Sequence, residues 1–124
     1  MTGPRIDRLT RRPEFLAVAA SGLRYATSSV VVQALPPAGS PAPPRASARF
    51  GFTATRKLGG AVIRNRARRR LKAAAALLAP DHARAGTDYV FVARGGALDR
   101  PWQDLLRDVA QAMDRAPSTR RQRR

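Results

Sequence analysis

A cluster of basic residues near the middle of the chain has the composition and spacing of a phosphate-binding surface. Residues 15–80 contain no aspartate or glutamate, and residues 61–71 read Ala-Val-Ile-Arg-Asn-Arg-Ala-Arg-Arg-Arg-Leu. A helix would bring several of these polar side chains to one face and leave an apolar stripe on the other. Those predicted to share the basic face are Arg64, Asn65, Arg68, Arg69 and Lys72. Arg66 and Arg70 flank the apolar stripe, so their stems should cover the core while their guanidinium groups reach outward.

This basic face needs a partner of opposite charge, because unneutralised neighbouring cations weaken a helix. The acidic residues that usually alternate with basic ones on a solvated helix face are missing here. A row of phosphates would make the arrangement favourable, since each phosphate that is neutralised releases counterions. RNA binding is therefore the preferred interpretation, and a merely solvated basic face is the alternative.

The composition of the whole chain indicates the same class of partner. Its 124 residues include 24 lysines and arginines against 8 acidic residues, which gives a formal net charge of +16. A protein with this charge repels itself unless a polyanion neutralises it, and nucleic acid is the expected polyanion. The absence of cysteine excludes disulfides and cysteine-based zinc sites. The length and the hydrophobic fraction of 44% fit one domain with one modest core.

No group of side chains has the pattern of a protein active site for phosphodiester hydrolysis. Such a site needs clustered carboxylates that hold metal ions, or a histidine general base. His82 is the only histidine, and it follows a proline that should end a helix. Asp104 and Asp108 could share a helix face, but nearby Arg100 and Arg107 explain them as a solvated surface. We therefore predict no catalytic residue and no metal ligand in this chain.

Secondary structure must position the basic residues, and the N-terminal half predicts a helix followed by strands. Thr10 can cap a helix whose first turn accepts Pro13, and Gly22 should stop it. Residues 24–35 are rich in β-branched residues, which favours a short strand followed by a main one. Residues 36–47 hold five of the ten prolines, which predicts a flexible loop between two antiparallel strands.

The C-terminal half predicts two strands and two helices. Residues 49–55 alternate between apolar and polar or small side chains, as in a half-buried strand. An apolar stripe at helical spacing follows and should end at Pro80. Its members are Ile63, Ala67, Leu71, Ala74 and Leu78. Residues 88–93 are apolar on both faces, which places that strand inside the sheet. Residues 101–114 predict the last helix, and the tail from Ala116 has no predicted core residue and should be disordered.

These segments together predict an α/β (α+β) sandwich with a small mixed sheet. The expected order is α-β-β-β-α-β-α, in which the third and fourth strands are joined by a helical crossover. Residues 1–115 would form a single RNA-binding domain, and residues 116–124 would form a basic tail.

The central segment also resembles a known family. Residues 50–71 read Phe-Gly-Phe-Thr-Ala-Thr-Arg-Lys-Leu-Gly-Gly-Ala-Val-Ile-Arg-Asn-Arg-Ala-Arg-Arg-Arg-Leu. This run is similar to the signature of the protein subunit of bacterial ribonuclease P. The shared features are a strand followed by two basic residues, a glycine, an Ala-Val pair, the Arg-Asn-Arg triplet and further basic positions on the same helix. Outside this segment, residues 88–94 resemble the family's last strand, and the resemblance spans most of residues 8–114.

The resemblance implies a fold, a partner and a division of labour. The fold would be a small α/β domain with a left-handed βαβ crossover, whose basic helix docks on the catalytic RNA. The residues implied at that surface are Arg56, Lys57, Arg64, Asn65, Arg66, Arg68, Arg69 and Lys72. A groove between the first helix and the sheet would hold the 5′ leader of precursor tRNA, with Phe15 in its lining. The RNA subunit would perform the cleavage with bound Mg²⁺, and the protein would contribute affinity and positioning.

Two strand residues extend the predicted leader site. Val31 and Gln33 share a strand face with Ser29 that is less apolar than the opposite face, so they would join Phe15 in the groove. The alternative is that Phe15 is an ordinary core residue and Gln33 is merely exposed. Many family members carry a second aromatic residue one helical turn after Phe15, whereas this chain has Ala19. Stacking of leader bases should therefore be weaker here.

The implied function is that of a protein subunit that helps ribonuclease P remove the 5′ leader of precursor tRNA. One alternative is a ribosomal protein or general RNA chaperone, which would use the same basic charge but would not distinguish tRNA with a leader from tRNA without one. Another is a protein-only nuclease, which would need a carboxylate cluster that this sequence lacks. The expected partners are the catalytic RNA and precursor tRNA, with no membrane and no obligatory protein partner. No apolar stretch is long enough for a secretory signal or a membrane span, so a cytoplasmic location is expected.

Overall fold

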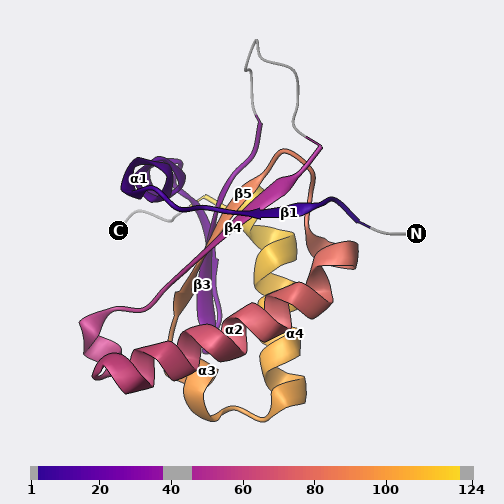
Figure 1. The fold of residues 1–124 in the computed structure, drawn as a ribbon. Helices are drawn as coiled ribbons and strands as arrows, with labels where there is room; N and C mark the ends of the chain where they lie inside the picture. The colour runs from indigo at the N-terminus through magenta and orange to yellow at the C-terminus, as the bar shows by residue number, and fades with distance from the viewer. Residues whose placement is uncertain (1–2, 38–45, 121–124) are drawn as a thin grey trace.

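A computed structural model describes residues 3–37 and 46–120 as one five-stranded sheet with helices on both faces (Figure 1). The strands are β1 (Ile6–Arg8), β2 (Leu23–Ala26), β3 (Val30–Leu35), β4 (Ala48–Thr53) and β5 (Asp88–Ala93). The helices are α1 (Arg12–Ala20), α2 (Ala61–His82), α3 (Gly96–Asp99) and α4 (Trp102–Arg115), with short 3-10 turns η1 (Arg56–Leu58) and η2 (Ala116–Ser118). Helix α1 lies on one face of the sheet, and α2 and α4 cover the other.

The sheet is mixed, with strand order β1-β4-β5-β3-β2. Strand β5 pairs parallel with β4 and antiparallel with β3, and five of its six residues are buried. The prediction that this strand lies inside the sheet is therefore confirmed. Helix α2 connects the parallel neighbours β4 and β5, as the resemblance implies. The left-handedness of this crossover stays a prediction.

The proline-rich loop joins strands that are not neighbours. Strands β3 and β4 run in opposite directions, as expected, but β5 lies between them. The two strands consequently form no hairpin. Most of the loop, residues 38–45, lies outside the described residues.

Strand β1 and helix α3 are short elements that the sequence did not predict. Strand β1 has only three residues, and its backbone hydrogen bonds hold it in place: the Ala48 N–H donates to the Arg5 carbonyl and the Leu9 N–H to the Phe50 carbonyl, each at 2.9 Å. Helix α3 has four residues. Elements of this length are too short to show hydrophobic periodicity, so only their tertiary contacts define them.

The N-cap of helix α1 lies one residue later than predicted. Arg11, not Thr10, is the N-cap, and the Glu14 carboxylate accepts the backbone N–H groups of both residues, at 2.9 Å and 3.1 Å respectively. Glu14 therefore reaches back from the first turn and accepts the N–H groups of the two residues that precede the helix. The predicted stop at Gly22 is confirmed, because Gly22 follows the C-cap Ser21 with φ +74°.

Helix α2 does not end at Pro80, contrary to prediction. It continues to His82, and the Ala83 N–H donates to the Ala79 carbonyl at 3.0 Å. Proline in the last turn removes only one backbone hydrogen bond, so the helix can pass through it. Most of the predicted stripe is buried against the sheet, but Ile63 at its start is 37% exposed.

Aromatic side chains form the centre of the main core, between the sheet and helices α2 and α4. Phe50 lies edge-on to Tyr89 and Phe91, and Phe52 stacks on Phe91 with ring centroids 4.8 Å apart. A smaller cluster of Leu9, Val18 and Val90 lies under α1 on the opposite face. Rings on β4 and β5 thus hold together the strands that α2 connects.

The C-terminal segment is more ordered than the sequence indicated. Ala116 and Pro117 are buried in η2, the Arg24 N–H donates to the Thr119 carbonyl at 2.8 Å, and Leu23 pairs with Arg120. The prediction that the tail has no core residue was wrong, because small residues there pack against β2 and β3. Residues 121–124 lie outside the described part of the chain. Among the described helices, none is both long and apolar enough to cross a membrane.

Candidate nucleic-acid interface

A glycine turn connects the basic residues of η1 to the basic helix α2. Gly59 has φ +148°, a conformation that other residues rarely adopt, and a Cβ there would lie 2.9 Å from Cγ2 of Ile63. Arg56 and Lys57, which precede this turn, are both exposed. The turn therefore places two further cations beside the N-terminal end of α2.

The predicted basic residues of α2 lie on its outer surface. Asn65, Arg66, Arg69 and Lys72 are exposed, and Arg64 and Arg68 are partly buried. The Arg68 guanidinium donates a hydrogen bond to the Asn65 side-chain oxygen. Neighbouring residues thus orient one another along the helix without neutralising its charge.

Most acidic residues of the described chain are paired with basic residues outside the first half of α2. Within residues 3–37 and 46–120, no carboxylate lies within 4.0 Å of a basic side chain in the first half of α2. Asp104 and Asp108 instead contact Arg100 and Arg107, with the shortest contact at 3.0 Å. The charge on α2 is therefore available for an external anion.

Arg70 does not reach outward as predicted. Its guanidinium donates to the carbonyl oxygens of Ala97 and Arg100, at 3.1 and 2.9 Å, and lies 5.9 Å from the centre of the Trp102 ring. These carbonyls lie at the C-terminal end of α3, where a cation is favourable. Arg70 consequently joins α2 to α3 and α4 and belongs to the folded framework.

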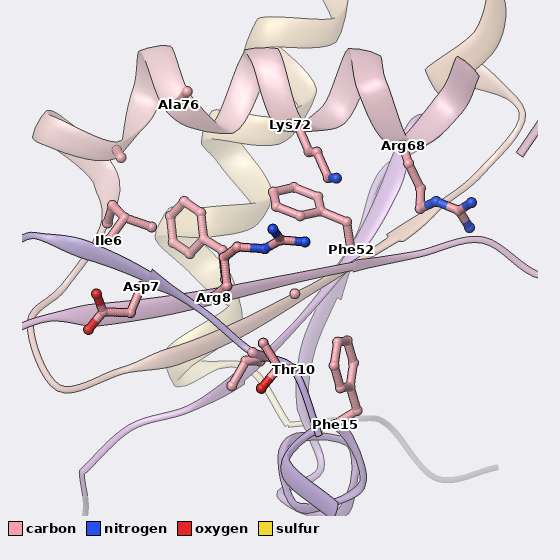
Figure 2. Close-up of a pocket in the computed structure, with 13 residues that line it drawn as sticks. Ile6, Asp7, Arg8, Thr10, Phe15, Phe52, Arg68, Lys72 and Ala76 are labelled. Carbon is pink, nitrogen blue, oxygen red and sulfur yellow. The ribbon is translucent and has the colours of Figure 1, made fainter. Parts of the chain in front are cut away.

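A groove of about 730 Å³ lies between α2 and the edge of the sheet. Figure 2 shows its wall residues from four elements: β1, α1, β4 and α2. Its lining includes Arg8, Thr10, Phe15, Phe52, Arg68 and Lys72. Phe15, predicted for the leader, therefore shares one groove with Arg68 and Lys72, predicted for the catalytic RNA.

Phe15 is held over a glycine of the central sheet. A Cβ on Gly51 would lie 2.5 Å from Cε2 of Phe15 and 3.2 Å from Cβ of Leu9. Only the absence of a side chain lets the ring approach β4 this closely. A lone glycine between two phenylalanines in a strand is a sequence signal for such close approach, although it does not identify the ring that approaches.

Val31 and Gln33 lie on the same face of the sheet as Phe15 but outside the groove. They pair with Val92 and Val90 of β5, and both are partly buried. Neither belongs to the groove lining. Ser29, predicted on the same strand face, is fully buried, and its hydroxyl donates to Asp108 at 2.6 Å. The predicted leader residues therefore share a face without forming one cavity.

Arg49 connects α1 to two strands, a role that no sequence pattern predicted. Its guanidinium donates to Asp88 through Nε at 2.9 Å and Nη2 at 2.7 Å, and to Glu14 through Nη1 at 2.8 Å. The hydrogen bond to Asp88 raises the pKa of Arg49. The backbone N–H groups of Arg11 and Thr10 lower the pKa of Glu14, and the charge of Arg49 acts in the same direction. Both side chains are thereby held in their charged forms next to Phe15.

Among the described residues, the acidic and histidine side chains considered for a protein active site, His82, Asp104 and Asp108, do not form a metal-binding cluster. In the part of the chain that the structure describes, no group of three or more histidine, aspartate or glutamate side chains could hold a metal ion. His82 Nδ1 lies 2.8 Å from Asp114, where it joins the ends of α2 and α4. Arg107 pairs with Asp104 at the helix surface, but the prediction of a solvated surface was wrong for Asp108, whose side chain is only 14% exposed and binds Arg100 and buried Ser29.

Comparison with known proteins gives one consistent relationship. The family model for ribonuclease P matches residues 4–117. The ribonuclease P protein component of Paramagnetospirillum magneticum is 45% identical over 111 residues, which cover 90% of this chain and 83% of that protein. That of Caulobacter vibrioides is 46% identical over 109 residues, or 88% and 70% of the two chains.

Solved structures share the fold at lower sequence identity. The RNase P protein from Thermotoga maritima has a TM-score of 0.70 and 20% identity, with coverage of 88% of this chain and 96% of that one. The Staphylococcus aureus RNase P protein has a TM-score of 0.66 and 21% identity, with coverage of 86% and 91%. Because the family model matches nearly the whole chain and close relatives align over most of their length, this chain belongs to the ribonuclease P protein family.

Proposed function

We propose that this chain is the protein subunit of ribonuclease P and promotes removal of the 5′ leader from precursor tRNA by the RNA subunit. The observation that supports this most is the unneutralised basic face of α2 next to a groove that contains Phe15. The relatives that match most of its length are ribonuclease P protein components. The protein would act in the cytoplasm, where bacterial tRNA is transcribed.

The basic residues would dock on the catalytic RNA. Those proposed for this contact are Arg56, Lys57, Arg64, Asn65, Arg66, Arg68, Arg69 and Lys72. Exposed guanidinium groups present planar sets of donors that match phosphate oxygens, and their mutual repulsion falls when phosphates lie between them. Arg68 and Lys72 also line the groove, so they would lie where the catalytic RNA and the leader meet.

The leader would lie against the α1 face of the sheet. Phe15 offers a partly exposed ring fixed on Gly51, and a fixed aromatic ring can stack on any base of a single strand. Val31 and Gln33 lie on the same sheet face and would extend this path beyond the groove. The protein would thereby bind precursor tRNA more tightly than mature tRNA, which has no leader.

Cleavage itself would be performed by the RNA subunit with bound Mg²⁺. Such a subunit supplies affinity and positioning and needs no acid-base side chain. The described residues fit that role, because most of their carboxylates contact arginines or His82 and the basic residues of α2 such as Arg69 are exposed. The magnesium ions would be held mainly by RNA phosphates, whose oxygens suit this cation.

Cleavage of precursor tRNA at low magnesium tests the proposed function. The reaction is compared with the cognate catalytic RNA alone, with this protein alone, and with both. We expect the combination to be fast and each component alone to be slow. Cleavage by protein alone would indicate a protein nuclease, and RNA binding without acceleration would indicate a general RNA-binding protein.

Salt dependence tests the docking face. Replacement Arg64→Ala should weaken binding to the catalytic RNA and reduce the slope of log Kd against log salt by about one. The matched control is Arg107→Ala, which removes an exposed arginine from α4 that pairs with Asp104. Equal slopes for wild type and Arg64→Ala would move the docking face away from α2.

A further inference from the structure

The groove has a second aromatic wall that comes from the other face of β4. Successive residues of a strand point to opposite faces, so Gly51 faces Phe15 of α1 while Phe52 faces α2. Strand β1 ends at Arg8, and its last contact with β4 is the hydrogen bond from Leu9 to Phe50. Beyond that point, both Phe15 and Phe52 line the same groove around the edge of β4 (Figure 2).

Phe52 is a rigid ring with part of its surface available. It stacks on Phe91 at an interplanar angle of 14°, and it lies edge-on to Phe50 with centroids 6.3 Å apart. The core therefore fixes the position of the ring, while its partial burial leaves surface open to the groove. A ring that is already fixed loses little conformational freedom when a base packs against it.

Cations border this wall from both sides of the groove. Figure 2 shows Arg8 of β1 and Lys72 of α2 on either side of Phe52. Both side chains are exposed, and Arg68 lies one helical turn from Lys72 on the same wall. Asp7, the acidic residue of the lining, pairs with Arg5 at 3.2 Å. An aromatic surface between cations fits a nucleotide, with its base on the ring and its phosphate on the cations.

We propose that this part of the groove binds one unpaired nucleotide of the 5′ leader, with its base against Phe52 and its phosphate between Arg8 and Lys72. This inference rests on the proposed function and extends it to a second, adjacent nucleotide. The first would stack on Phe15, and the chain would turn around the edge of β4 to reach Phe52. The site supplies the second aromatic contact that Ala19 on α1 cannot make.

The leader fits this groove better than the catalytic RNA does. A base must be unpaired to present its face to an aromatic ring, and a leader strand is single-stranded along its length. The position on Phe52 is also continuous with Phe15, whereas the remaining basic residues of α2, such as Arg69, lie outside the lining. The docking face and the nucleotide site thus share only Arg68 and Lys72.

Holoenzyme binding to precursor tRNA tests the proposal with abasic substitutions along the leader. In wild type, abasic changes at two neighbouring leader positions should each weaken binding about fivefold or more, as loss of base stacking does. In the Phe52→Leu variant, the abasic change at one of these leader positions should no longer weaken binding, while the change at the other position should still weaken it. In Phe15→Leu the pattern should reverse, because each ring contacts its own base.

Two controls separate this site from the fold and from docking. Leu105→Ala removes a buried core side chain of α4 that lies outside the groove, so any general loss of stability should appear there without a change in the abasic pattern. Arg69 lies on α2 outside the groove, so Arg69→Ala, measured with saturating protein, should leave the preference for precursor over mature tRNA unchanged. Lys72→Ala and Arg8→Ala should weaken the precursor complex more than the mature one.

The outcomes distinguish this inference from the proposed function. If wild type prefers precursor over mature tRNA and Phe15→Leu removes that preference, but Phe52→Leu leaves every abasic effect unchanged, the second nucleotide site is refuted alone. If Phe52→Leu, Lys72→Ala and Arg8→Ala weaken both tRNA complexes equally, the groove binds the catalytic RNA instead. If wild type shows no leader preference at all, the proposed leader binding fails as well.

Discussion

Arg49 shows how a network of ion pairs can fix the position of a neighbouring aromatic ring. Its guanidinium holds Asp88 with two donors and Glu14 with a third, while Glu14 also closes the start of α1. Phe15 follows Glu14 directly, and Gly51, on which its ring rests, lies two residues after Arg49 on the same face of β4. Strand β4 therefore positions both the Arg49 guanidinium and the Phe15 ring at the first turn of α1.

The acid sensitivity of this arrangement can be predicted from Glu14. Because the pKa of Glu14 is lowered in the folded state, its contribution to stability is complete above the ordinary carboxyl range of about 4 and is lost as pH falls through the lowered value. Glu14→Gln should therefore lower the melting temperature at neutral pH and flatten its fall at acid pH. Thermal unfolding from about pH 7 to pH 2 measures both effects.

Asp81→Asn is the matched control, because Asp81 is exposed on the last turn of α2. It should leave the acid branch of the stability curve close to that of wild type. An acid branch of unchanged steepness in Glu14→Gln would mean that other carboxylates dominate acid unfolding.

Residue types and spacing were enough to predict the exposed cations of α2, but not the partners of its buried side chains. Asn65 and Arg69 are exposed where helical spacing placed them. Arg70 lies one residue from Arg69 yet binds the carbonyls of Ala97 and Arg100, which are 27 and 30 residues away in sequence. Helical periodicity predicts which side of the helix a side chain faces. It does not predict which distant part of the backbone that side chain will contact.

At the scale of elements, α2 has two kinds of arginine with separate effects. Arg70→Ala should cost roughly 1–3 kcal/mol of folding free energy, since it removes two hydrogen bonds from a charged donor and a contact with Trp102. Affinity of the folded protein for the catalytic RNA should stay near that of wild type. Urea unfolding and RNA binding at low denaturant measure the two effects separately.

Arg69→Ala is the neighbouring variant for comparison. It should leave stability almost unchanged and weaken RNA binding, because Arg69 is exposed and has no carboxylate within 4.0 Å among the described residues. If Arg70→Ala weakened RNA binding as much as Arg69→Ala without loss of stability, Arg70 would belong to the docking face.

The long elements were predictable because each shows a clear period, and the short ones were not. Alternation defined β4, and stripes at helical spacing defined α2 and α4. Strand β1, which forms one wall of the groove, has three residues of mixed character and is defined by its pairing with β4. The basic face and Phe15 were therefore predictable from the sequence, but the groove that brings them together was not.

The whole molecule separates its charges by position. Acidic residues lie mainly on α1, β5 and α4, where they pair with arginines or His82. In the first half of α2, every charged residue is basic. Six of the 24 basic residues thus lie between Arg64 and Lys72, where no carboxylate pairs with them among the described residues. A polyanion that binds this face should stabilise the fold, because it binds the folded state more tightly than the unfolded chain.

Short-chain polyphosphate tests this expectation at constant ionic strength. At about one hundred times its Kd, it should add roughly 2–3 kcal/mol to the free energy of unfolding relative to sodium chloride. The increase should shrink when Arg64 and Arg69 are both replaced by alanine. An equal increase in that double variant would place the anion elsewhere on the protein.

The position of β5 also determines when this protein can fold during its synthesis on the ribosome. Strand β5 lies at the centre of the sheet between β3 and β4, yet it is the last strand to be made. Strands separated by so much sequence pair slowly, because a long loop must close before their contacts form. A nascent chain that has not yet reached residue 93 would carry the basic helix and both flanking strands but lack the strand that joins them. The residues of the proposed RNA-binding surface are therefore synthesised well before the sheet that supports them can form.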